Sequence, residues 1–203
     1  MLSKRTKKFK AMKKSIDWEK QWAAFAPGYE NGALKVSVGK VSLSLLAGGG
    51  FGDLSHPTTK LMLQAMPEHV AGKTVVDIGC GSGILSIAAM KLGAKKVYAL
   101  DISDDALEHT HKNAQRNHVS IETSKKLDSI PEDDLLILMN MISSEQKIAW
   151  NMNQCLHKKK ALFITSGVLK EQHHEYLALL QQWKLHVLDI IYLDNWILYK
   201  LKT

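Results

Sequence analysis

The chain has 203 residues, of which 45% are hydrophobic and 23% charged, so it can form one sizeable core of ordinary globular composition. No apolar run reaches the length of a membrane span, and the basic first residues lack the apolar segment of a secretory signal. The net charge of +7 resides in residues 1–14, which contain seven lysine or arginine residues and no acid, so the remainder is neutral.

The composition predicts a short tail and one domain. We expect residues 1–14 to form a basic flexible tail and residues 15–203 a single domain. Within the domain, residues 15–72 supply a helix, short strands and a loop, and residues 73–203 supply the core of a sheet. The tail has two interpretations, an arm that contacts RNA or a ribosome through phosphates, or a solvated extension without a partner.

Cys80 and Cys155 are too few to make a disulfide framework. Cys80 also lies inside a glycine-rich turn, where a disulfide would be out of place. A reducing compartment is therefore the expected environment, and the predicted location is cytoplasmic.

The part before the sheet is weakly patterned. Ser15 is a candidate N-cap for a helix over residues 16–25, with Asp17 in its first turn. One face of this helix carries Trp18, Trp22 and Phe25. The elements expected next are one or two short strands over residues 34–46, an irregular glycine-rich loop over residues 48–59 and a helix over residues 61–69.

Residues 73–101 are typical of a strand, a glycine turn, a helix and a second strand, and the rest of the chain is organised around them. Ser82 is the candidate N-cap of an amphipathic helix over residues 82–92. The second strand, residues 97–100, ends on Asp101. Such a unit is a parallel crossover, and its ligand lies beyond the carboxyl ends of the strands.

The glycine turn fits two classes of ligand. A dinucleotide site needs the pattern G-x-G-x-x-G/A, but Ile84 occupies the sixth position. The segment from Asp77 to Gly83 instead reads D-x-G-x-G-x-G, which resembles the first motif of class I S-adenosylmethionine-dependent methyltransferases. The resemblance implies that the turn passes under the cofactor and that Asp101 binds both ribose hydroxyls. One carboxylate can accept two such hydroxyl donors.

Beyond Asp101, helices and strands alternate. Ser103 is the candidate cap of a helix over residues 103–117. A strand over residues 135–139 ends at Asn140, and Ser143 or Ser144 then caps a helix that extends to about residue 156. The other expected elements are strands near residues 119–123, 161–166, 185–192 and 196–201 and a helix over residues 169–182.

This order predicts an α/β fold, a Rossmann-like, doubly wound and mostly parallel seven-stranded sheet with an antiparallel last strand, in which the two final strands form an antiparallel edge. Asp194 and Asn195 are expected to form the hairpin-like turn between the two final strands. Class I methyltransferases have this fold, so the resemblance and the order of elements agree.

The family resemblance sharpens at three segments, FGDLSHPTT (51–59), DIGCGSGILSIAAMKLGA (77–94) and NMI (140–142). Together they resemble the bacterial protein-lysine methyltransferases that modify large-subunit ribosomal protein eleven. The likeness covers roughly residues 17–201. It implies that the cofactor is S-adenosylmethionine and that the substrate is a protein, with a ribosomal protein as a candidate.

The resemblance also implies roles for individual residues. The cofactor contacts that it implies are Thr59, Asp77, Gly79, Gly81, Asp101 and Asn140. Asn140 is in addition the expected catalytic residue, because its amide oxygen can accept a hydrogen bond from the target amine and orient it toward the methyl group. Positioning does most of the work in such a displacement, so no strong base is required in principle.

The chain departs from the family pattern at two points. Where the family has F-G-T-G-T-H, this chain has Leu54 in place of a glycine, so the loop must take a different path or avoid positive φ there. Asp53 adds a carboxylate that could help to bind a cationic substrate. The family also has a separate N-terminal substrate-recruiting domain, and only the tail and the tryptophan helix are expected in its place.

No metal site is predicted. His109 and His111 point to different helix faces and His173 and His174 are adjacent, so neither pair suits a metal, and all four are expected at the surface. His56, which precedes a proline in the loop, fits either a base or a structural role.

Three hypotheses of function follow. The first is a methyltransferase acting on a lysine or N-terminal amine of a protein, with a ribosomal protein as a candidate. The second keeps the cofactor but acts on RNA or a small molecule, although no Pro-Pro-aromatic run is present to stack a flipped base. The third is a non-catalytic protein that binds the ribosome or RNA through a methyltransferase fold.

Overall fold

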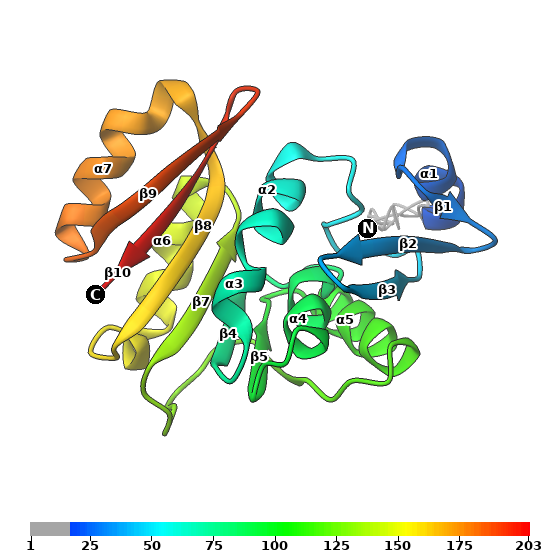
Figure 1. Ribbon diagram of the computed structural model, residues 1–203, viewed down its shortest axis with the longest axis horizontal. Coiled ribbons are helices and arrows are strands. Elements are labelled where there is room, and N and C mark those ends of the chain that lie inside the picture. The colour runs from blue at the N-terminus through cyan, green and yellow to red at the C-terminus, as the bar shows by residue number, and fades with distance from the viewer. Residues whose placement is uncertain (1–16) are drawn as a thin grey trace, which may run out of the picture.

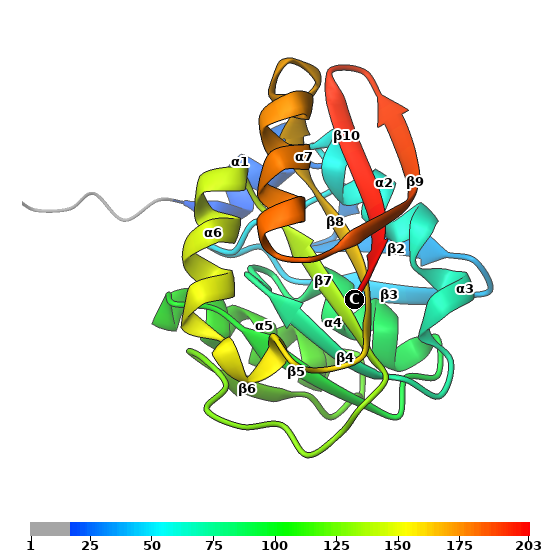
Figure 2. The same cartoon turned by 90° about the vertical axis from the view of Figure 1, so that its left-hand side faces the viewer.

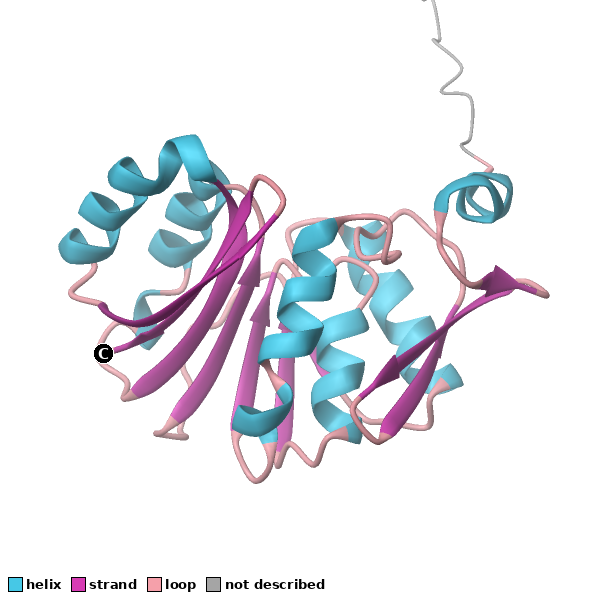
Figure 3. Ribbon diagram, turned by 45° about the horizontal axis from the view of Figure 1, so that its top comes forward, coloured by secondary structure: helices cyan, strands magenta, loops and turns pink. Residues whose placement is uncertain are grey.

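A twisted seven-stranded sheet forms the centre of the computed structural model, which describes residues 17–203 (Figures 1 and 3). Its strands are β4 (Thr74–Ile78), β5 (Lys96–Leu100), β6 (Glu122–Ser124), β7 (Leu135–Asn140), β8 (Ala161–Leu169), β9 (His186–Leu193) and β10 (Trp196–Lys202). They lie in the order β6-β5-β4-β7-β8-β10-β9. The strands from β6 to β8 pair in parallel, as the sequence predicts.

The two final strands form an antiparallel edge of the sheet, as predicted, and the last strand is the inner one of the two. β10 pairs antiparallel with both β8 and β9, so it lies between them and β9 becomes the edge strand. The turn at Asp194, which adopts a φ of 52°, returns the chain from β9 into this position. The prediction that the last strand is antiparallel is confirmed. Its position in the strand order could not be predicted from the residues of the strand and its turn.

Helices cover both faces of the sheet. One face carries α2 (Pro57–Ala65), α3 (Pro67–Val70), α4 (Ile84–Lys91) and α5 (Asp104–Arg116). The other face carries α6 (Ser143–Met152) and α7 (His173–Gln182), which lie to the left of β7 and β8 in Figure 2. Short 3-10 helices, η1 (Gln154–Leu156) and η2 (Lys170–Gln172), follow α6 and precede α7.

The central strands are apolar on both faces because helices cover both of them. Along β7, Leu136 and Leu138 pack in the cluster that contains α2 and α4, whereas Leu135, Ile137 and Met139 pack in the cluster that contains α6 and α7. This alternation is the two-residue period of a strand. All of these side chains are fully buried, which fixes the register of β7 and hence the position of the residue that follows it.

A second, three-stranded sheet lies at one end of the molecule, beside α4 and α5 (Figure 1). It consists of β1 (Tyr29–Glu30), β2 (Ala33–Val38) and β3 (Val41–Leu45), and it follows helix α1 (Trp18–Phe25). Trp22 and Leu34 belong to the same buried cluster as Ile84, so this sheet shares a core with the large one. The predicted short strands within residues 34–46 are confirmed.

Several predicted helix starts are wrong by a few residues. In α1 the N-cap is Asp17, whose Oδ1 accepts from the N–H of Lys20 at 3.0 Å, and the alternative cap Ser15 lies outside the described residues. Helix α2 begins at Pro57, earlier than expected, because proline is suited to the first helical position and the His56 ring accepts from the N–H of Thr58.

Two serine caps expected from the sequence are also not observed. The residue before α4 is Gly83, in the left-handed region, and Ser82 instead donates to the carbonyl of Gly52. Helix α6 starts at Ser143 itself, without a side-chain cap. The expected cap Ser103 is confirmed, since its Oγ accepts from the N–H of Ala106.

The predicted boundary between tail and domain, residues 14 and 15, lies outside the described part of the chain. Within residues 17–203, no helix is both long and apolar enough to span a membrane.

Candidate active site

A cavity of about 510 Å³ opens beyond the carboxyl ends of β4, β5 and β7. The strand order reverses at β4, which lies between β5 and β7. Such a switch point is where ligands bind in open α/β sheets. The predicted site residues that line the cavity are Gly79, Gly81, Asp101 and Asn140.

The glycine turn forms one wall of the cavity. Gly79, Gly81 and Gly83 have φ values of 76°, 55° and 80°, which residues with a side chain rarely adopt. The N–H groups of Gly79 and Cys80 donate to the carbonyl of Leu100 at 2.7 and 2.9 Å. The turn is thereby held to the end of β5, and its backbone faces the cavity without intervening side chains.

Asp101 is held by backbone donors on both of its oxygens. Oδ2 accepts from the N–H of Gly81 at 3.1 Å, and Oδ1 accepts from the N–H of Ser103 at 3.0 Å. A carboxylate offers about four lone-pair positions, so each oxygen keeps one for a further donor. The side chain is therefore oriented before a ligand arrives and can still accept two hydroxyl groups.

Asp77 lies beneath the glycine turn and does not line the cavity. Its Oδ2 accepts from the hydroxyl of Ser86 at 2.6 Å, and its Oδ1 has no partner. Burial raises the pKa of this carboxyl to about 6, against the lowering effect of the Ser86 hydrogen bond. An unpaired buried oxygen is costly, so the position has the character of a functional site rather than of simple packing.

Asn140, at the end of β7, presents the second unpaired oxygen. Its Nδ2 lies 3.5 Å from the hydroxyl of Thr59, and its Oδ1 is buried without a hydrogen-bond partner. Thr59 itself is fully buried on α2 and does not reach the cavity. Thr59 contacts the Asn140 amide from behind the cavity wall, and its expected contact with the cofactor stays a prediction.

The loop from residue 46 to residue 56 covers the glycine turn. The N–H of Ser82 donates to the carbonyl of Phe51 at 2.9 Å. A Cβ on Gly50 would lie 2.3 Å from the carbonyl carbon of Gly81, so the two backbones touch. The glycine content of this loop was noted in the sequence, but no local signal indicated which segment it would contact.

Leu54 does not avoid positive φ, contrary to one of the two expectations. It adopts a φ of 66°, in the left-handed region that costs a non-glycine residue roughly 1–2 kcal/mol. The carboxylate of Asp53 accepts from both the N–H and the hydroxyl of Ser55, at 3.0 and 2.5 Å, and so stabilises the turn. Asp53 does not line the cavity, so the structure gives no support to its expected contact with substrate.

Three of the rings that line the cavity pack against one another. His56 packs edge-on against Phe51 and Trp196, with ring centroids 5.5 and 4.6 Å apart. Nδ1 of His56 accepts from the N–H of Thr58 at 3.3 Å and lies 2.8 Å from the Thr58 hydroxyl. Burial lowers the pKa of His56. A neutral ring that accepts at Nδ1 carries its proton on Nε2, so neither nitrogen is free to act as a base.

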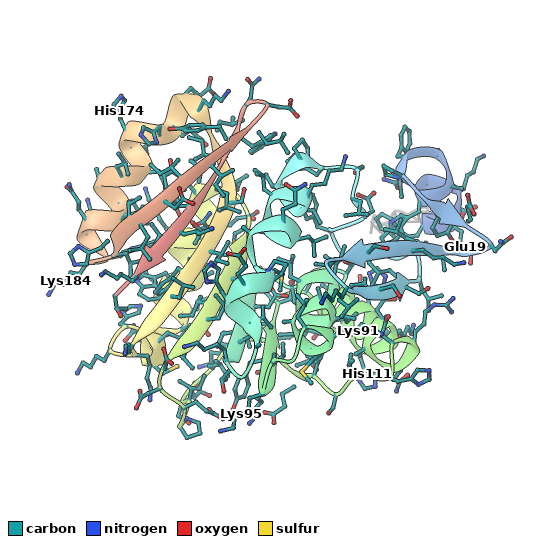
Figure 4. All side chains as sticks on the ribbon, viewed as in Figure 1. Glu19, Lys91, Lys95, His111, His174 and Lys184 are labelled. Carbon is teal, nitrogen blue, oxygen red and sulfur yellow. The ribbon has the colours of Figure 1, made fainter. Side chains whose placement is uncertain are left out.

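His109 is buried, which contradicts its predicted position at the surface. Its Nδ1 accepts from the N–H of Gly50 at 3.1 Å, and its Nε2 donates to the carbonyl of Leu46 at 2.8 Å. The ring thus fastens the covering loop to α5. His111 and His174 are exposed, as expected, and point outward in Figure 4.

The mouth of the cavity is unusually apolar. Its exposed large hydrophobic side chains, each with 39–71% of its surface accessible, are Phe51, Ile102, Ile142, Ile148 and Met152. Lys125 is the one lysine or arginine among the described residues that line the cavity. Within residues 17–203, no three His, Cys, Asp or Glu side chains gather as metal ligands.

A sheet of this order, with a glycine turn beside an acid at the end of the second parallel strand, is that of a class I methyltransferase. The model of the family described as "Ribosomal protein L11 methyltransferase (PrmA)" matches residues 3–203. The chain belongs to this family.

Individual relatives agree. A ribosomal protein L11 methyltransferase of Tolumonas auensis is 39% identical over 150 residues, 70% of this chain and 50% of the relative. One from Caldicellulosiruptor saccharolyticus is 32% identical over 195 residues, 90% of this chain and 64% of the relative. The crystal structure of a ribosomal protein L11 methylase from Lactobacillus delbrueckii subsp. bulgaricus is 29% identical, with a TM-score of 0.58 over 71% of this chain and 75% of that one. The chain thus spans between half and two thirds of the length of these curated relatives.

Proposed function

We propose that this protein transfers the methyl group of S-adenosylmethionine to an amine of a protein, and that the substrate is a ribosomal protein, as the names of its relatives suggest. The observation that carries the proposal is the pairing of two features in one cavity. Asp101 is held by two backbone N–H groups and keeps free lone pairs, and Asn140, whose Oδ1 has no hydrogen-bond partner, lines the same cavity.

The cavity residues fit the cofactor. Asp101 accepts from the two ribose hydroxyls, and the bare backbone at Gly79 and Gly81 lets the amino-acid part lie close to the turn. Asp77, beneath the turn, adds negative charge near the cationic cofactor without touching the cavity. S-adenosylmethionine supplies an electrophilic methyl group on a sulfonium.

Asn140 orients the acceptor. Its Oδ1 accepts a hydrogen bond from the neutral amine and so directs the nitrogen lone pair toward the methyl group. The rings of Phe51, His56 and Trp196 add apolar surface to the wall of the same cavity. Since His56 is not a free base, the amine loses its proton to solvent before it enters.

The apolar mouth favours a protein over RNA as substrate. Exposed Ile, Phe and Met side chains match the side chains of a polypeptide, whereas a phosphate backbone requires lysine and arginine. RNA contact, if the basic tail provides it, would concern residues 1–14 and not the mouth. The free thiols of Cys80 and Cys155 agree with a cytoplasmic protein.

Radiolabelled S-adenosylmethionine, incubated with purified ribosomal protein L11, with whole ribosomes and with ribosomal RNA, tests the proposal. Label is expected in protein. Label in RNA alone would support the RNA alternative, and transfer to none of the three would leave a non-catalytic binding protein as the better account.

Two variants assign the roles within the site. Asp101→Ala should weaken cofactor binding by about 1–3 kcal/mol, because two ribose hydroxyls lose their acceptor. Asn140→Ala should slow single-turnover transfer by about a hundredfold while cofactor affinity changes little. Calorimetry that shows equal affinity for Asp101→Ala, or a normal rate for Asn140→Ala, would remove that residue from the site.

Deleting residues 1–14 tests the tail. If the tail holds ribosomes through phosphates, the truncated protein should co-sediment less with them and depend less steeply on salt concentration, with cofactor affinity unchanged. Equal co-sedimentation of the two forms would show that the tail is a solvated extension.

A further inference from the structure

A fully buried glutamine lies directly behind the residues that we assign to the acceptor. Gln146, on α6, does not line the cavity. Its Nε2 donates to the carbonyl of Met141 at 2.8 Å and to the carbonyl of Ser166 at 3.1 Å. Its Oε1 accepts from the hydroxyl of Tyr176 at 2.5 Å. All of its strong hydrogen-bonding groups are engaged, and only one orientation of the amide satisfies them.

The segment that Gln146 holds follows Asn140 directly. The N–H of Met141 donates to the carbonyl of Ser166 at 3.2 Å, so β8 holds the peptide group before Met141 and Gln146 holds the one after it. Met141 is also packed tightly against two glycines. A Cβ on Gly167 would lie 2.2 Å from the Met141 oxygen, and a Cβ on Gly79 would lie 2.2 Å from the Met141 methyl group.

Met141 therefore connects the two halves of the site. Its backbone is held by Gln146 and β8, and its side chain rests on the glycine turn at Gly79. A shift of the Met141 peptide would move Asn140 relative to that turn. Reaction rates are sensitive to such displacements of a reacting group, whereas binding of the cofactor through Asp101 is not.

We propose that Gln146, oriented by Tyr176, is a positioning residue that sets the geometry of Asn140 toward the transferred methyl group. This inference rests on the proposed function. The hydroxyl of Tyr176 also lies 3.0 Å from that of Thr165, so the orienting chain continues from α7 into β8. The Tyr176 side chain is buried, which raises its pKa and keeps it a donor.

The chain offers a matched control for a buried amide with a purely structural role. Asn117 is also buried, donates through Nδ2 to the carbonyls of Ser44 and Asn113 at 2.6 and 2.8 Å, and accepts at Oδ1 from the N–H of Ser44 at 2.9 Å. It does not line the cavity. Removing either amide leaves comparable buried groups unpaired, so the two variants should lose comparable stability.

The experiment compares Gln146→Met with Asn117→Leu. Gln146→Met should slow single-turnover methyl transfer about tenfold or more, with the dissociation constant of S-adenosylhomocysteine changed less than about twofold. Asn117→Leu should melt at a similarly lowered temperature and keep the rate. Tyr176→Phe leaves both hydrogen bonds donated by Gln146 in place and should slow methyl transfer by a smaller factor. This variant provides the test if Gln146→Met does not fold.

Hydrogen exchange separates this inference from the proposed function. The N–H of Met141 should exchange faster in Gln146→Met than in Asn117→Leu, without any substrate present. The positioning role would be overturned if hydrogen exchange at Met141 were unchanged in Gln146→Met, or if Gln146→Met transferred methyl groups no more slowly than Asn117→Leu. If the wild-type protein transfers no methyl group, the proposed function is overturned, and so is any role of Gln146 in that reaction. The exchange measurement then still decides whether Gln146 holds the Met141 segment.

Discussion

Two glycine-rich loops meet at the cavity, and they use glycine for different reasons. In the turn from residue 79 to 83, every glycine has positive φ, so the backbone conformation already requires glycine there, in addition to the close neighbours that a Cβ would meet. In the loop from residue 48 to 52, only Gly52 has positive φ. Gly48 and Gly50 are needed because a Cβ would collide with the His109 ring or with the Gly81 backbone. A local requirement can be predicted from a motif, and a close approach between distant segments cannot.

The largest expected effect comes from breaking the close approach. Gly50→Ala places a Cβ 2.3 Å from the backbone of Gly81, which cannot yield as a flexible side chain would. We expect a loss of about 3 kcal/mol in the free energy of unfolding, together with weaker cofactor binding. Gly49→Ala is the control, since its nearest neighbour is the Trp18 ring at 3.3 Å. Equal losses in denaturant unfolding would contradict a special role for residue 50.

A buried titratable group lies next to each loop, and the two respond to pH with opposite sign. Burial raises the pKa of Asp77, beneath the turn, from 3.8 to about 6. Between these values the unfolded chain has lost the proton and the folded chain keeps it, so stability falls as pH rises. The loss approaches about 3 kcal/mol and is complete above about pH 6.

Asp77→Asn should therefore abolish this falling limb. Urea unfolding of wild type and variant, without cofactor, should give a difference in unfolding free energy that changes between about pH 4 and 6 and is constant above. A difference independent of pH would show that the Asp77 carboxyl has an ordinary pKa in the folded protein.

His109, which fastens the other loop, gives the opposite slope. Burial lowers its pKa below 6.5, so just below pH 6.5 the unfolded chain binds more protons and stability rises with pH until that value is passed. His109→Gln should reduce the free energy of unfolding by roughly 1–2 kcal/mol at pH 7.5, because the hydrogen bonds to Gly50 and Leu46 are lost or weakened. The reduction should be smaller at lower pH.

The exposed His111 on the same helix is the control for this pair of measurements (Figure 4). His111→Gln should leave both the stability and its pH dependence as in the wild type. If the two variants behaved alike, the buried ring would not be what holds the loop.

The smallest effect is expected at Leu54, where the loop departs from its family. Leu54→Gly removes the backbone strain of a left-handed conformation, but it also makes the unfolded chain more flexible and removes a partly buried side chain. Because these effects oppose one another, the free energy of unfolding should change by less than about 1 kcal/mol. Leu54→Ala keeps the strain and loses the packing, so it should be the less stable of the two by thermal melting. The reverse order would show that φ at residue 54 carries no strain.

Residues 73–101 show how far local pattern reaches. The strands, the glycine turn, the helix and the terminal Asp101 were all predicted, because period, turn residues and strand ends are properties of neighbouring residues. The cap at Ser103 was predicted for the same reason. The cap at Ser82 was wrong because the covering loop, distant in sequence, takes its hydroxyl.

The candidate site was predicted in part, since four of its predicted residues line the cavity. Thr59 and Asp77 lie behind the wall, because burial depends on what packs over a residue and not on its motif. Trp196 and Gln146 come from separate elements and were not among the predicted site residues, and only the fold brings Trp196 to the cavity and Gln146 to the segment after Asn140.

What the sequence by itself determined is the parallel α/β architecture and the acid and glycine turn at the ends of its first two parallel strands, since short-range periodicity and backbone sterics specify both. Only the tertiary structure decided the place of β10 between β8 and β9, the burial of His109 and the unpaired oxygen of Asn140. These depend on contacts between segments far apart in the chain, whose geometry is set by the packing of the whole core.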